Sequence, residues 1–504
     1  MHGGRTAARR LGSVLLALAA LTAPLVPGPA VAAPGRHEAR LEVQLRQART
    51  FALHQLARTD RRLRPDRFPT VAVPGQPWRT SGTNGWLAGF WPGRLWLAYQ
   101  ADGRPAWARR AAARQAPLVV RQDDTTAHDL GFVLQTSFGR GAAVAARSQD
   151  AAVVRRAAAA LATRYVPSAA AIRCWDGPSG QVTVNIDNLM NLELLFQAAD
   201  LGGPTRWRDL AVQHALTSAR WQVRPDGSTF HVMRLDEQTG LPTWRGTVQG
   251  ASDESTWARG HAWAVHGFTT AYRESHDERL LDAARRTAGY AVTSAPADGV
   301  PWWDYDATGT RRDTTAAAVL GSGLLELARI DPDPQMRARW RAAGMHTLRS
   351  LVGPQYLARG TGAWSVLLQG RHDSTYDESG VTYGDHYLLE ALLRVELLPA
   401  ARPALHVAQV QRGRHGGLRA DLPGIRTVSG VSVRWRQGTP TRFVVQTSRD
   451  GQHWSAGRGG VSSGLGAGLE TYDVRDRAAR YVRVRPLPAA DGSTGRPLRV
   501  VVRG

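Results

Sequence analysis

The succession of helical segments separated by short turns restricts the fold of this chain more than any other feature of its sequence. Between about residues 38 and 398, apolar residues recur at three- and four-residue steps in about twelve segments rich in alanine, leucine and arginine. Glycine and proline mark the joins, as in Gly202-Gly203-Pro204, and no fixed sequence repeat supports an open helical solenoid. We therefore predict a mainly α fold in which residues 34–403 form six helix pairs closed into an (α/α)6 toroid.

The pattern changes to a two-residue alternation of apolar and polar side chains after about residue 404. Residues 431–436, 443–446 and 481–485 alternate in this way, and glycine- and serine-rich turns separate them. We expect residues 404–504 to form a small antiparallel β-sandwich. This region holds 17 arginines and 6 acidic residues, which is about half of the formal charge excess of +22. Its basic surface suggests a contact with an acidic glycan.

The N-terminal residues predict export from the cell. Arg5, Arg9 and Arg10 precede an apolar run over residues 11–26, and Ala30-Val31-Ala32 provides a small-residue cleavage pattern. We therefore expect residues 1–33 to be the signal peptide of a secreted protein, and the sequence leaves the general and twin-arginine export routes open. No later stretch is long and apolar enough to span a bilayer. The single cysteine, Cys174, excludes an intrachain disulfide.

The charge of the chain narrows the class of partner. All 64 residues counted as lysine or arginine are arginine, which indicates codon bias as much as selection for binding to a polyanion. A basic exported protein is nonetheless attracted to acidic polysaccharides by its electrostatic field. The sequence has no nucleic-acid motif and no continuous basic run, so nucleic acid is not an expected partner. It also has no cluster with metal-ligand spacing, and we expect neither a metal nor an organic cofactor.

Two aspartates among apolar neighbours are the candidate catalytic residues. Asp129 lies in His128-Asp129-Leu130-Gly131-Phe132, and Asp187 lies in Asn185-Ile186-Asp187-Asn188 at the start of a predicted helix. Desolvation and a nearby like charge both raise the pKa of a carboxyl group, and a proton donor at neutral pH needs such surroundings. A single aspartate at a helix start is more often a cap, because the helix dipole favours it there. Two such sites, together with the segment over residues 249–263, favour catalysis.

The segment over residues 249–263 suggests a site for a sugar carboxylate. Arg259 and Trp263 are four residues apart and therefore share one helix face. An indole ring packs on a pyranose, while a guanidinium fork binds two carboxylate oxygens. A core tryptophan beside a solvated arginine is the ordinary alternative. Further aromatic residues are available for the same cavity: Trp86, Phe90 and Trp175.

Motifs along the helical region together resemble the unsaturated glucuronyl hydrolases, glycoside hydrolase family 88. They are His231 and residues 86–96, 128–132, 185–191, 249–263, 313–327 and 383–390. The likeness covers nearly all of the helical region, in the same order, and the related unsaturated rhamnogalacturonyl hydrolases match less well. It implies an (α/α)6 barrel that acts on the 4,5-unsaturated uronic acid left at the non-reducing end by polysaccharide lyases.

The resemblance also implies roles for individual residues. Asp187 corresponds to the proton donor and Asp129 to its partner. His261 and His386 stand where glutamine and tyrosine are common in the family, which affects fine specificity rather than the reaction. The substrate contacts that the resemblance implies are Trp86, Phe90, His128, Trp175, His231, Gln249, Arg259, Trp263 and Tyr383.

The substrate implied by the resemblance is a vinyl ether, whose C4 is electron-rich. Protonated Asp187 would deliver a proton to C4, and the resulting carboxylate would activate the water that adds at C5. The hemiketal then opens and releases the neighbouring sugar. Two other functions stay open, an ordinary inverting glycosidase with two carboxylates on the same barrel and a non-catalytic protein that binds acidic glycans.

The C-terminal region resembles a discoidin-like (coagulation factor 5/8 C-type) module. The resemblance rests on Thr447-Ser448-Arg449-Asp450-Gly451-Gln452-His453-Trp454 and on residues 479–484. The module is short at its front end, where such modules usually have an opening segment. Both glycan binding and a purely structural cap on the barrel are compatible with this sequence.

Overall fold

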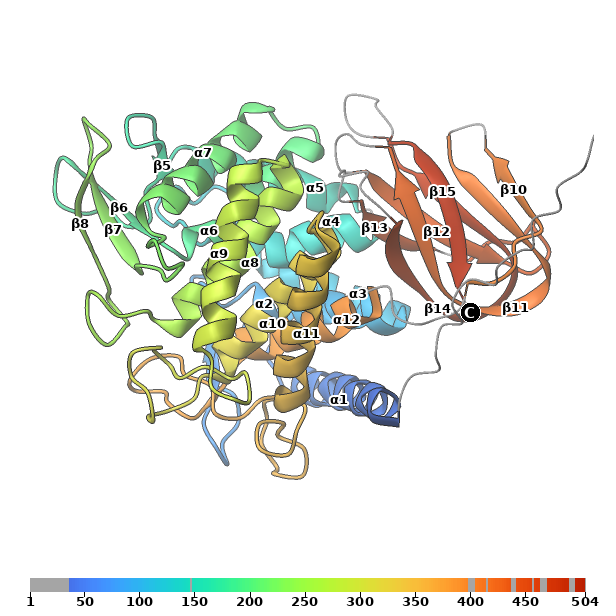
Figure 1. Ribbon diagram of the computed structural model, residues 1–504, viewed down its shortest axis with the longest axis horizontal. Coiled ribbons are helices and arrows are strands. Elements are labelled where there is room, and N and C mark those ends of the chain that lie inside the picture. Colours follow the sequence, from blue (N-terminus) through green and yellow to red (C-terminus); the bar gives the residue numbers. More distant parts are fainter. Residues whose placement is uncertain are drawn as a thin grey trace, which may run out of the picture.

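The computed structural model of the protein covers most of the chain after the predicted signal peptide. It describes residues 36–145, 147–397, 404–413, 416–436, 441–455, 457–462, 469–488 and 495–503. Over these ranges a helical unit is followed by a β unit that lies beside it (Figure 1). The predicted signal peptide, residues 1–33, and the join at residues 398–403 lie outside the described residues.

Helices form in most of the segments that the apolar periodicity predicts, with ends that differ by a few residues. They are α1 (Arg36–Asp60), α2 (Phe90–Asp102), α3 (Pro105–Gln115), α4 (Arg140–Ala145), α5 (Ser148–Ala162), α6 (Asn188–Asp200), α7 (Arg206–Trp221), α8 (Ala258–Ser275), α9 (Glu278–Ser294), α10 (Thr314–Ile330), α11 (Pro334–Leu351) and α12 (Thr382–Leu397). Of these helices, α4 forms in addition to the predicted segments. No helix in the described ranges has both the length and the apolar character that crossing a membrane requires.

One predicted helix is of a different kind. The apolar spacing over residues 127–138 predicts an ordinary α-helix. The chain instead forms a short 3-10 helix, η1 (Ala116–Arg121), and then a π-helix, η2 (Gly131–Gly139), which leads into α4. Within η2 the hydroxyls of Thr136 and Ser137 donate to carbonyls four residues earlier. Such side-chain bonds compete with the regular backbone pattern of an α-helix. Apolar spacing alone does not report this competition.

Burial separates inner helical segments from outer ones. In α10 every residue from Thr314 to Ala328 is buried, whereas α11 buries one stripe between Trp340 and Leu351. Contacts link α2 to η2, η2 to α6, and then α6, α8, α10 and α12 in turn, and α12 packs against α2. The outer helices α3, α7, α9 and α11 each pack on the inner helix that precedes them. One large apolar core runs through both sets.

A three-stranded antiparallel sheet within the helical unit was not predicted. It consists of β6 (Gln181–Asn185), β7 (Val232–Asp236) and β8 (Pro242–Gly246). Asn185 pairs with Val232, so the sheet fixes the entry of the chain into α6. The other strands of this unit form two-residue pairs: β1 (Phe68–Pro69) with β3 (Thr80–Ser81), β2 (Val71–Ala72) with β9 (Gly380–Val381), and β4 (Tyr165–Val166) with β5 (Ala171–Ile172).

The β unit is antiparallel, as the two-residue alternation predicts. Its strands in the described ranges are β10 (Gln409–Arg412), β11 (Leu418–Trp435), β12 (Arg442–Ser448), β13 (Arg458–Val461), β14 (Leu469–Pro486) and β15 (Pro497–Arg503). The strand order is β10-β11-β14-β12-β13, and β15 also pairs with β11. The pairing of the long strands β11 and β14 shifts register near residues 421–426 and 428–430, where such strands bend. Their inward apolar side chains form a separate core.

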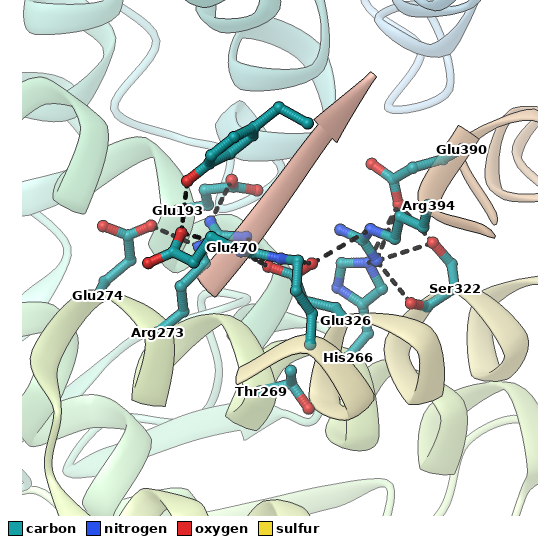
Figure 2. A network of polar contacts seen from close by, with 12 residues as sticks. Glu193, His266, Thr269, Arg273, Glu274, Ser322, Glu326, Glu390, Arg394 and Glu470 are labelled. Carbon is teal, nitrogen blue, oxygen red and sulfur yellow. Dashed lines mark hydrogen bonds and ion pairs between the residues drawn. The ribbon is translucent and has the colours of Figure 1, made fainter. Parts of the chain in front are cut away.

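A buried ion network joins the β unit to the helical unit (Figure 2). Arg329 of α10 lies 2.7 Å from Glu326 and 3.1 Å from Glu470 of β14. The hydroxyl of Tyr472 donates to Glu470 at 2.6 Å, and the indole N–H of Trp435 donates to Tyr472 at 3.0 Å. The side chains of Arg329 and Glu470 are each 9% exposed, so loss of one partner would leave a buried charge.

A second contact between the units involves close backbone approach. Arg442 of β12 donates to the carbonyl oxygen of Ala142 in α4. A Cβ atom on Gly459 of β13 would lie 3.0 Å from the carbonyl oxygen of Ala143, so a larger residue would force the units apart. A cavity of about 300 Å³ between the units is lined by charged residues of both, including Arg273 and Arg442. None of the predicted site residues lines this cavity.

Candidate active site

Asp187 lies where the chain passes from β6 into α6. It occupies the N-cap position of α6, but its side chain accepts no capping hydrogen bond. Oδ2 of Asp187 instead accepts from Nδ2 of Asn185 at 3.1 Å. Oδ1 has no hydrogen-bond partner in the part of the chain that the structure describes. The side chain is 14% exposed, so Asp187 presents a largely buried carboxyl oxygen that is free of the helix end.

Asp129 is connected to Asp187 through two polar side chains. Nε2 of His128 lies 3.2 Å from Oδ1 of Asp129 and 3.3 Å from Nδ2 of Asn185. Asn185 also contacts Asp187, so it links the two aspartates through His128. His128 is buried, whereas the side chain of Asp129 is 22% exposed.

The close approach of η2 to α6 brings the two aspartates into the same neighbourhood. A Cβ atom on Gly131 would lie 2.4 Å from Cα of Asn191, so only glycine fits at this crossing. Oδ1 of Asn191 accepts from the backbone N–H of Phe132 at 2.9 Å. These contacts hold the start of η2 against the first turn of α6, with Asp129 and Asp187 just before the two segments.

The two carboxyl groups are electrostatically coupled. Burial is the main cause that raises the pKa of Asp129, while His128 lowers this pKa and Asp187 raises it further. The protonated form of Asp129 is therefore favoured in its position beside Asp187.

His231 directs a ring nitrogen toward Asp187. Its Nδ1 accepts from the backbone N–H of Val248 at 3.2 Å and lies 3.2 Å from the hydroxyl of Thr247. In the neutral ring the proton is therefore on Nε2. Nε2 lies 3.8 Å from Oδ2 of Asp187 and has no hydrogen-bond partner among the described residues. It is a donor beside the carboxyl group, available to a bound ligand.

Arg259 holds the chain segment between α11 and α12. Its Nη1 donates to the carbonyl oxygen of Arg371, and its Nη2 donates to the carbonyl oxygen of His372 at 2.9 Å. Nη2 also donates to Oε1 of Gln249, which is exposed, at 2.7 Å. The sequence predicted a guanidinium fork that is free for a substrate carboxylate. In the structure both terminal nitrogens of this fork donate to protein groups.

The predicted aromatic residues near the ends of the site are accessible. Trp175 is 41% exposed, and its ring meets the ring of His128 edge-on at a centroid distance of 6.1 Å. Trp86 is half-buried and stacks on His372 at a centroid distance of 6.1 Å. These two tryptophans offer ring surface to a ligand.

The other predicted contacts with tryptophan, phenylalanine or tyrosine rings are buried. Trp263 is 1% exposed and packs against Phe132 and Tyr387, because α8 is an inner helix. Phe90 and Tyr383 are fully buried in the same aromatic cluster. The structure thus leaves the ring of Trp263 without an open face, and the predicted packing of Trp263 on a sugar ring stays a prediction.

Three residues of the site were not predicted as contacts. Asn185 and Trp257 lie inside motifs that the sequence singled out, whereas His372 lies in a segment without periodicity. The ring of Trp257 lies 4.4 Å from the ring of His231 and 4.4 Å from the guanidinium carbon of Arg259, so it joins the two halves of the site. Burial, together with Arg259, lowers the pKa of His372 to about 4 and keeps this ring neutral.

Metal binding and the thiol of the single cysteine also bear on the chemistry around the two aspartates. These residues contain no group of three or more His, Cys, Asp and Glu side chains that could hold a metal ion. Cys174 is buried nearby, and burial raises the pKa of its thiol, which leaves it protonated. The described site offers two carboxyl groups, a histidine donor and two accessible indole rings for ligand binding and proton transfer.

Comparisons with known proteins relate this chain to one enzyme family, although no family model matches it. An unsaturated glucuronyl hydrolase of Formosa agariphila is 34% identical over 328 residues, which are 62% of this chain and 80% of that relative. An unsaturated chondroitin disaccharide hydrolase of Streptococcus pyogenes serotype M1 is 32% identical over 346 residues, which are 65% of this chain and 85% of that relative.

A similar solved structure belongs to the same kind of enzyme as these relatives. An unsaturated glucuronyl hydrolase specific for heparin is 32% identical and superposes with a TM-score of 0.67, covering 70% of this chain and 97% of that structure. The chain is more than 30% identical to the Formosa agariphila enzyme over four fifths of the length of that enzyme, which shows that the two proteins belong to one family. The chain is a member of the unsaturated glucuronyl hydrolases and is therefore an enzyme of the glycosidase class.

Proposed function

We propose that this enzyme removes a 4,5-unsaturated uronic acid from the non-reducing end of lyase-generated oligosaccharides by hydrating the double bond. The placement of Asp187 carries this proposal. Its Oδ1 has no partner among the described residues, and a second carboxyl group and a histidine donor lie beside it. The names of the relatives, which include a chondroitin disaccharide hydrolase and a heparin-specific enzyme, support fragments of acidic polysaccharides as the substrate class.

The first chemical step is proton transfer to carbon. The ring oxygen of the unsaturated uronate donates electron density into the C4–C5 double bond, which makes C4 the basic atom. Protonated Asp187 delivers its proton to C4, and positive charge develops at C5 and on the ring oxygen. Asp187 is then a carboxylate, ready to act as a base.

The second step returns the proton to Asp187. A water molecule adds through its oxygen to C5 and gives a proton to the carboxylate of Asp187. The hemiketal opens when the bond between C5 and the ring oxygen breaks, which leaves a ketone at C5 and a hemiacetal at C1. Collapse of this hemiacetal to an aldehyde releases the neighbouring sugar. Each atom is accounted for without a cofactor.

The neighbours of Asp187 have supporting roles in this proposal. Asp129 stays close enough to couple electrostatically with Asp187, and it orients the substrate. The Nε2 proton of His231 binds a substrate oxygen beside the reacting carbon. Trp86 and Trp175 pack on the sugar rings, because these two indoles are accessible.

The finer architectural assignments belong to the same proposal. The contacts that pass from α2 through η2, α6, α8, α10 and α12 back to α2 support a closed (α/α)6 toroid. The antiparallel strands of the β unit are compatible with a discoidin-like sandwich. We further propose that the protein is secreted and that the β unit contacts acidic glycans.

An ultraviolet assay tests the proposed substrate. Disaccharides with a terminal 4,5-unsaturated uronate are prepared with lyases from chondroitin, hyaluronan, heparin and gellan, and the absorbance of the conjugated double bond is followed. We expect loss of absorbance together with release of the second sugar for at least one of these disaccharides. Saturated disaccharides of the same composition should not be cleaved. Cleavage of the saturated series at a similar rate would instead identify an ordinary glycosidase.

A further inference from the structure

The strands β11, β14 and β12 lie side by side in the β unit (Figure 1). One face of this sheet carries arginine and aromatic side chains. Along β14, Val482 and Val484 are buried, and the alternate residues Tyr481, Arg483 and Arg485 point to the opposite face. Arg419 of β11 is the register partner of Arg483 on the adjacent strand. We name this surface the arginine face; it consists of Arg419, Trp454, Tyr481, Arg483 and Arg485.

The arginine face concentrates like charges. Arg419 and Arg483 lie directly opposite each other on neighbouring strands, which destabilises a sheet unless the charge is compensated. Partial burial, and then the charges of Arg485 and Arg419, lower the pKa of Arg483. The carboxylate of Asp421 contacts Arg419 at 2.8 Å. With three guanidinium groups and this one carboxylate, the face keeps a positive excess that an anion would offset.

Aromatic and amide contacts hold the arginines in fixed positions. The guanidinium carbon of Arg483 lies 4.0 Å from the ring centre of Trp454, and Nε of Arg483 donates to Oε1 of Gln446 at 2.8 Å. The guanidinium carbon of Arg419 lies 4.4 Å from the ring centre of Tyr481. Side chains that are ordered before a ligand arrives lose less entropy when they bind it. The face is therefore preorganised, in contrast to a surface of freely moving charges.

The arrangement suits an acidic sugar chain. Guanidinium groups bind carboxylate and sulfate oxygens, and indole and phenol rings pack on pyranose faces. Trp454 also lines a surface hollow beside this face, together with Arg449, Arg477 and the carboxylate of Asp450. A neutral polysaccharide would leave the arginine charges uncompensated.

We propose that the arginine face binds a chain of acidic polysaccharide, of the class whose unsaturated ends the helical unit hydrolyses. The choice of this ligand rests on the proposed function, and charge complementarity between the face and uronate or sulfate groups supports it. Binding of the polymer would keep the enzyme near the fragments that lyases release and would raise their local concentration. The site lies on the sheet face and is separate from the carboxylate pair.

The test compares polymer binding by the full chain and two double variants. Arg483→Gln/Arg485→Gln removes two charges from the arginine face. Arg109→Gln/Arg341→Gln removes two exposed charges from α3 and α11 and is the matched control. Dissociation constants for chondroitin sulfate, for neutral dextran and for double-stranded DNA are measured at low and at physiological salt. We expect the face variant to bind chondroitin sulfate at least about tenfold more weakly, since each charged contact contributes substantially, and the control to change less than about twofold.

Two further variants keep the result interpretable. Arg485→Glu changes only one exposed side chain, so it can replace the double variant if that protein does not fold. Arg485→Glu should also weaken polymer binding. Trp454→Ala should weaken binding of chondroitin sulfate more than binding of DNA, because ring packing on the sugar is lost. Turnover of an unsaturated disaccharide should stay at the wild-type level in all variants, since none of these residues belongs to the carboxylate site.

Two results would overturn the proposal. Equal affinity of the face variant and the control variant for chondroitin sulfate would show that the arginine face is an ordinary solvated surface. Equal loss of affinity for DNA and chondroitin sulfate in every variant would show a general polyanion surface without saccharide recognition. Polymer binding that persists in a protein without disaccharide turnover would contradict the proposed function and leave the arginine face supported, so the two failures are distinguishable.

Discussion

At the scale of single residues, Asp187 and Asp129 differ in what their oxygens contact. Asp187 bonds through Oδ2 to Asn185 and leaves Oδ1 without a partner in the described chain. Asp129 lies against His128 and keeps 22% of its side-chain surface exposed. The difference suggests one residue that transfers the proton and one that tunes the site electrostatically.

Asp187→Asn should remove turnover and leave substrate binding largely intact. The amide is nearly isosteric with the carboxyl group, but it cannot donate and recover a proton. A positioned acid–base group contributes about 10²–10⁴-fold to the rate, so we expect kcat to fall at least about a hundredfold. Steady-state kinetics and equilibrium binding of an unsaturated disaccharide measure the two effects. Asp209→Asn, on an exposed position of α7, is the control and should behave as wild type.

Asp129→Asn should change stability in a pH-dependent manner. Burial raises the pKa of Asp129 in the folded protein. Folding therefore favours the protonated form, and this contribution is complete below the ordinary aspartate pKa of about 4 and is lost as pH rises through the raised value. At neutral pH the ionised group destabilises the fold. The variant should have a higher Tm than wild type at pH 7, and the difference should shrink toward pH 4. A difference that is constant across this range would contradict the assigned environment of Asp129.

At the scale of elements, the site depends on the junctions between regular segments. The start of η2, the turn from β6 into α6, and the segment between α11 and α12 each bring one group of residues to the site. Arg259 of the inner helix α8 connects to the last of these through the carbonyl oxygens of Arg371 and His372. The position of His372 beside Trp86 therefore depends on the guanidinium of Arg259.

Arg259→Lys should loosen the segment around His372. A lysine ammonium keeps the charge, but it cannot reach both carbonyl oxygens and Gln249 with the geometry of the planar fork. We expect KM for an unsaturated disaccharide to rise several-fold while kcat changes less, because the residues of the carboxylate pair are not altered. Arg279→Lys, an exposed arginine of α9, is the control. An unchanged KM would assign Arg259 a purely structural role away from the ligand.

The sequence predicted the long helices well, because burial of one helix face imposes a periodic spacing of apolar residues that is visible within a short stretch of sequence. It did not predict β6, β7 and β8. The pairing of β6 with β7 joins residues about fifty positions apart, whereas β7 and β8 form a short hairpin. It also assigned Trp263 to the ligand, because spacing shows that Arg259 and Trp263 share a helix face but not what covers that face. Their surroundings depend on η2 and α12, which pack against α8 or its neighbours only in the folded chain.

Local sequence singled out the two candidate aspartates because each stands directly before a helical segment, and their catalytic role stays a prediction. What brings the pair together was not visible there. Gly131 and Asn191 set the distance between η2 and α6, and neither residue carries a chemical signature in the sequence. The role of Nε2 of His231 likewise depends on a hydrogen bond from the backbone of Val248, which only the fold supplies.

At the scale of the whole molecule, the two units share a buried ion network. Glu470 of β14 completes the contacts of Arg329, which also pairs with Glu326 in α10. The β unit is thus bound to the helical unit through a charge that lies almost out of contact with water. Removal of the β unit would expose this charged surface of the helical unit, so we expect the isolated helical unit to be less stable than the full chain.

Glu470→Gln tests this coupling without truncation. The substitution leaves Arg329 with one carboxylate partner, and removal of one partner from a buried pair is costly. We expect the free energy of unfolding to fall by up to about 3 kcal/mol, measured by denaturant titration. Asp123→Asn breaks the exposed pair with Arg156 and should cost less than about 1 kcal/mol. Equal small effects of both changes would mean that the network does not stabilise the joined units.

The stereochemistry of proton delivery tests the central claim most directly. The enzyme converts an unsaturated disaccharide in heavy water, and NMR locates deuterium at C4 of the product. Because Asp187 approaches the double bond from one side, we predict deuterium at one of the two C4 positions in every turnover. Asp187→Asn should give no labelled product. Equal labelling of both C4 positions would show that the double bond rearranges in solution after ordinary cleavage, and it would contradict hydration by Asp187.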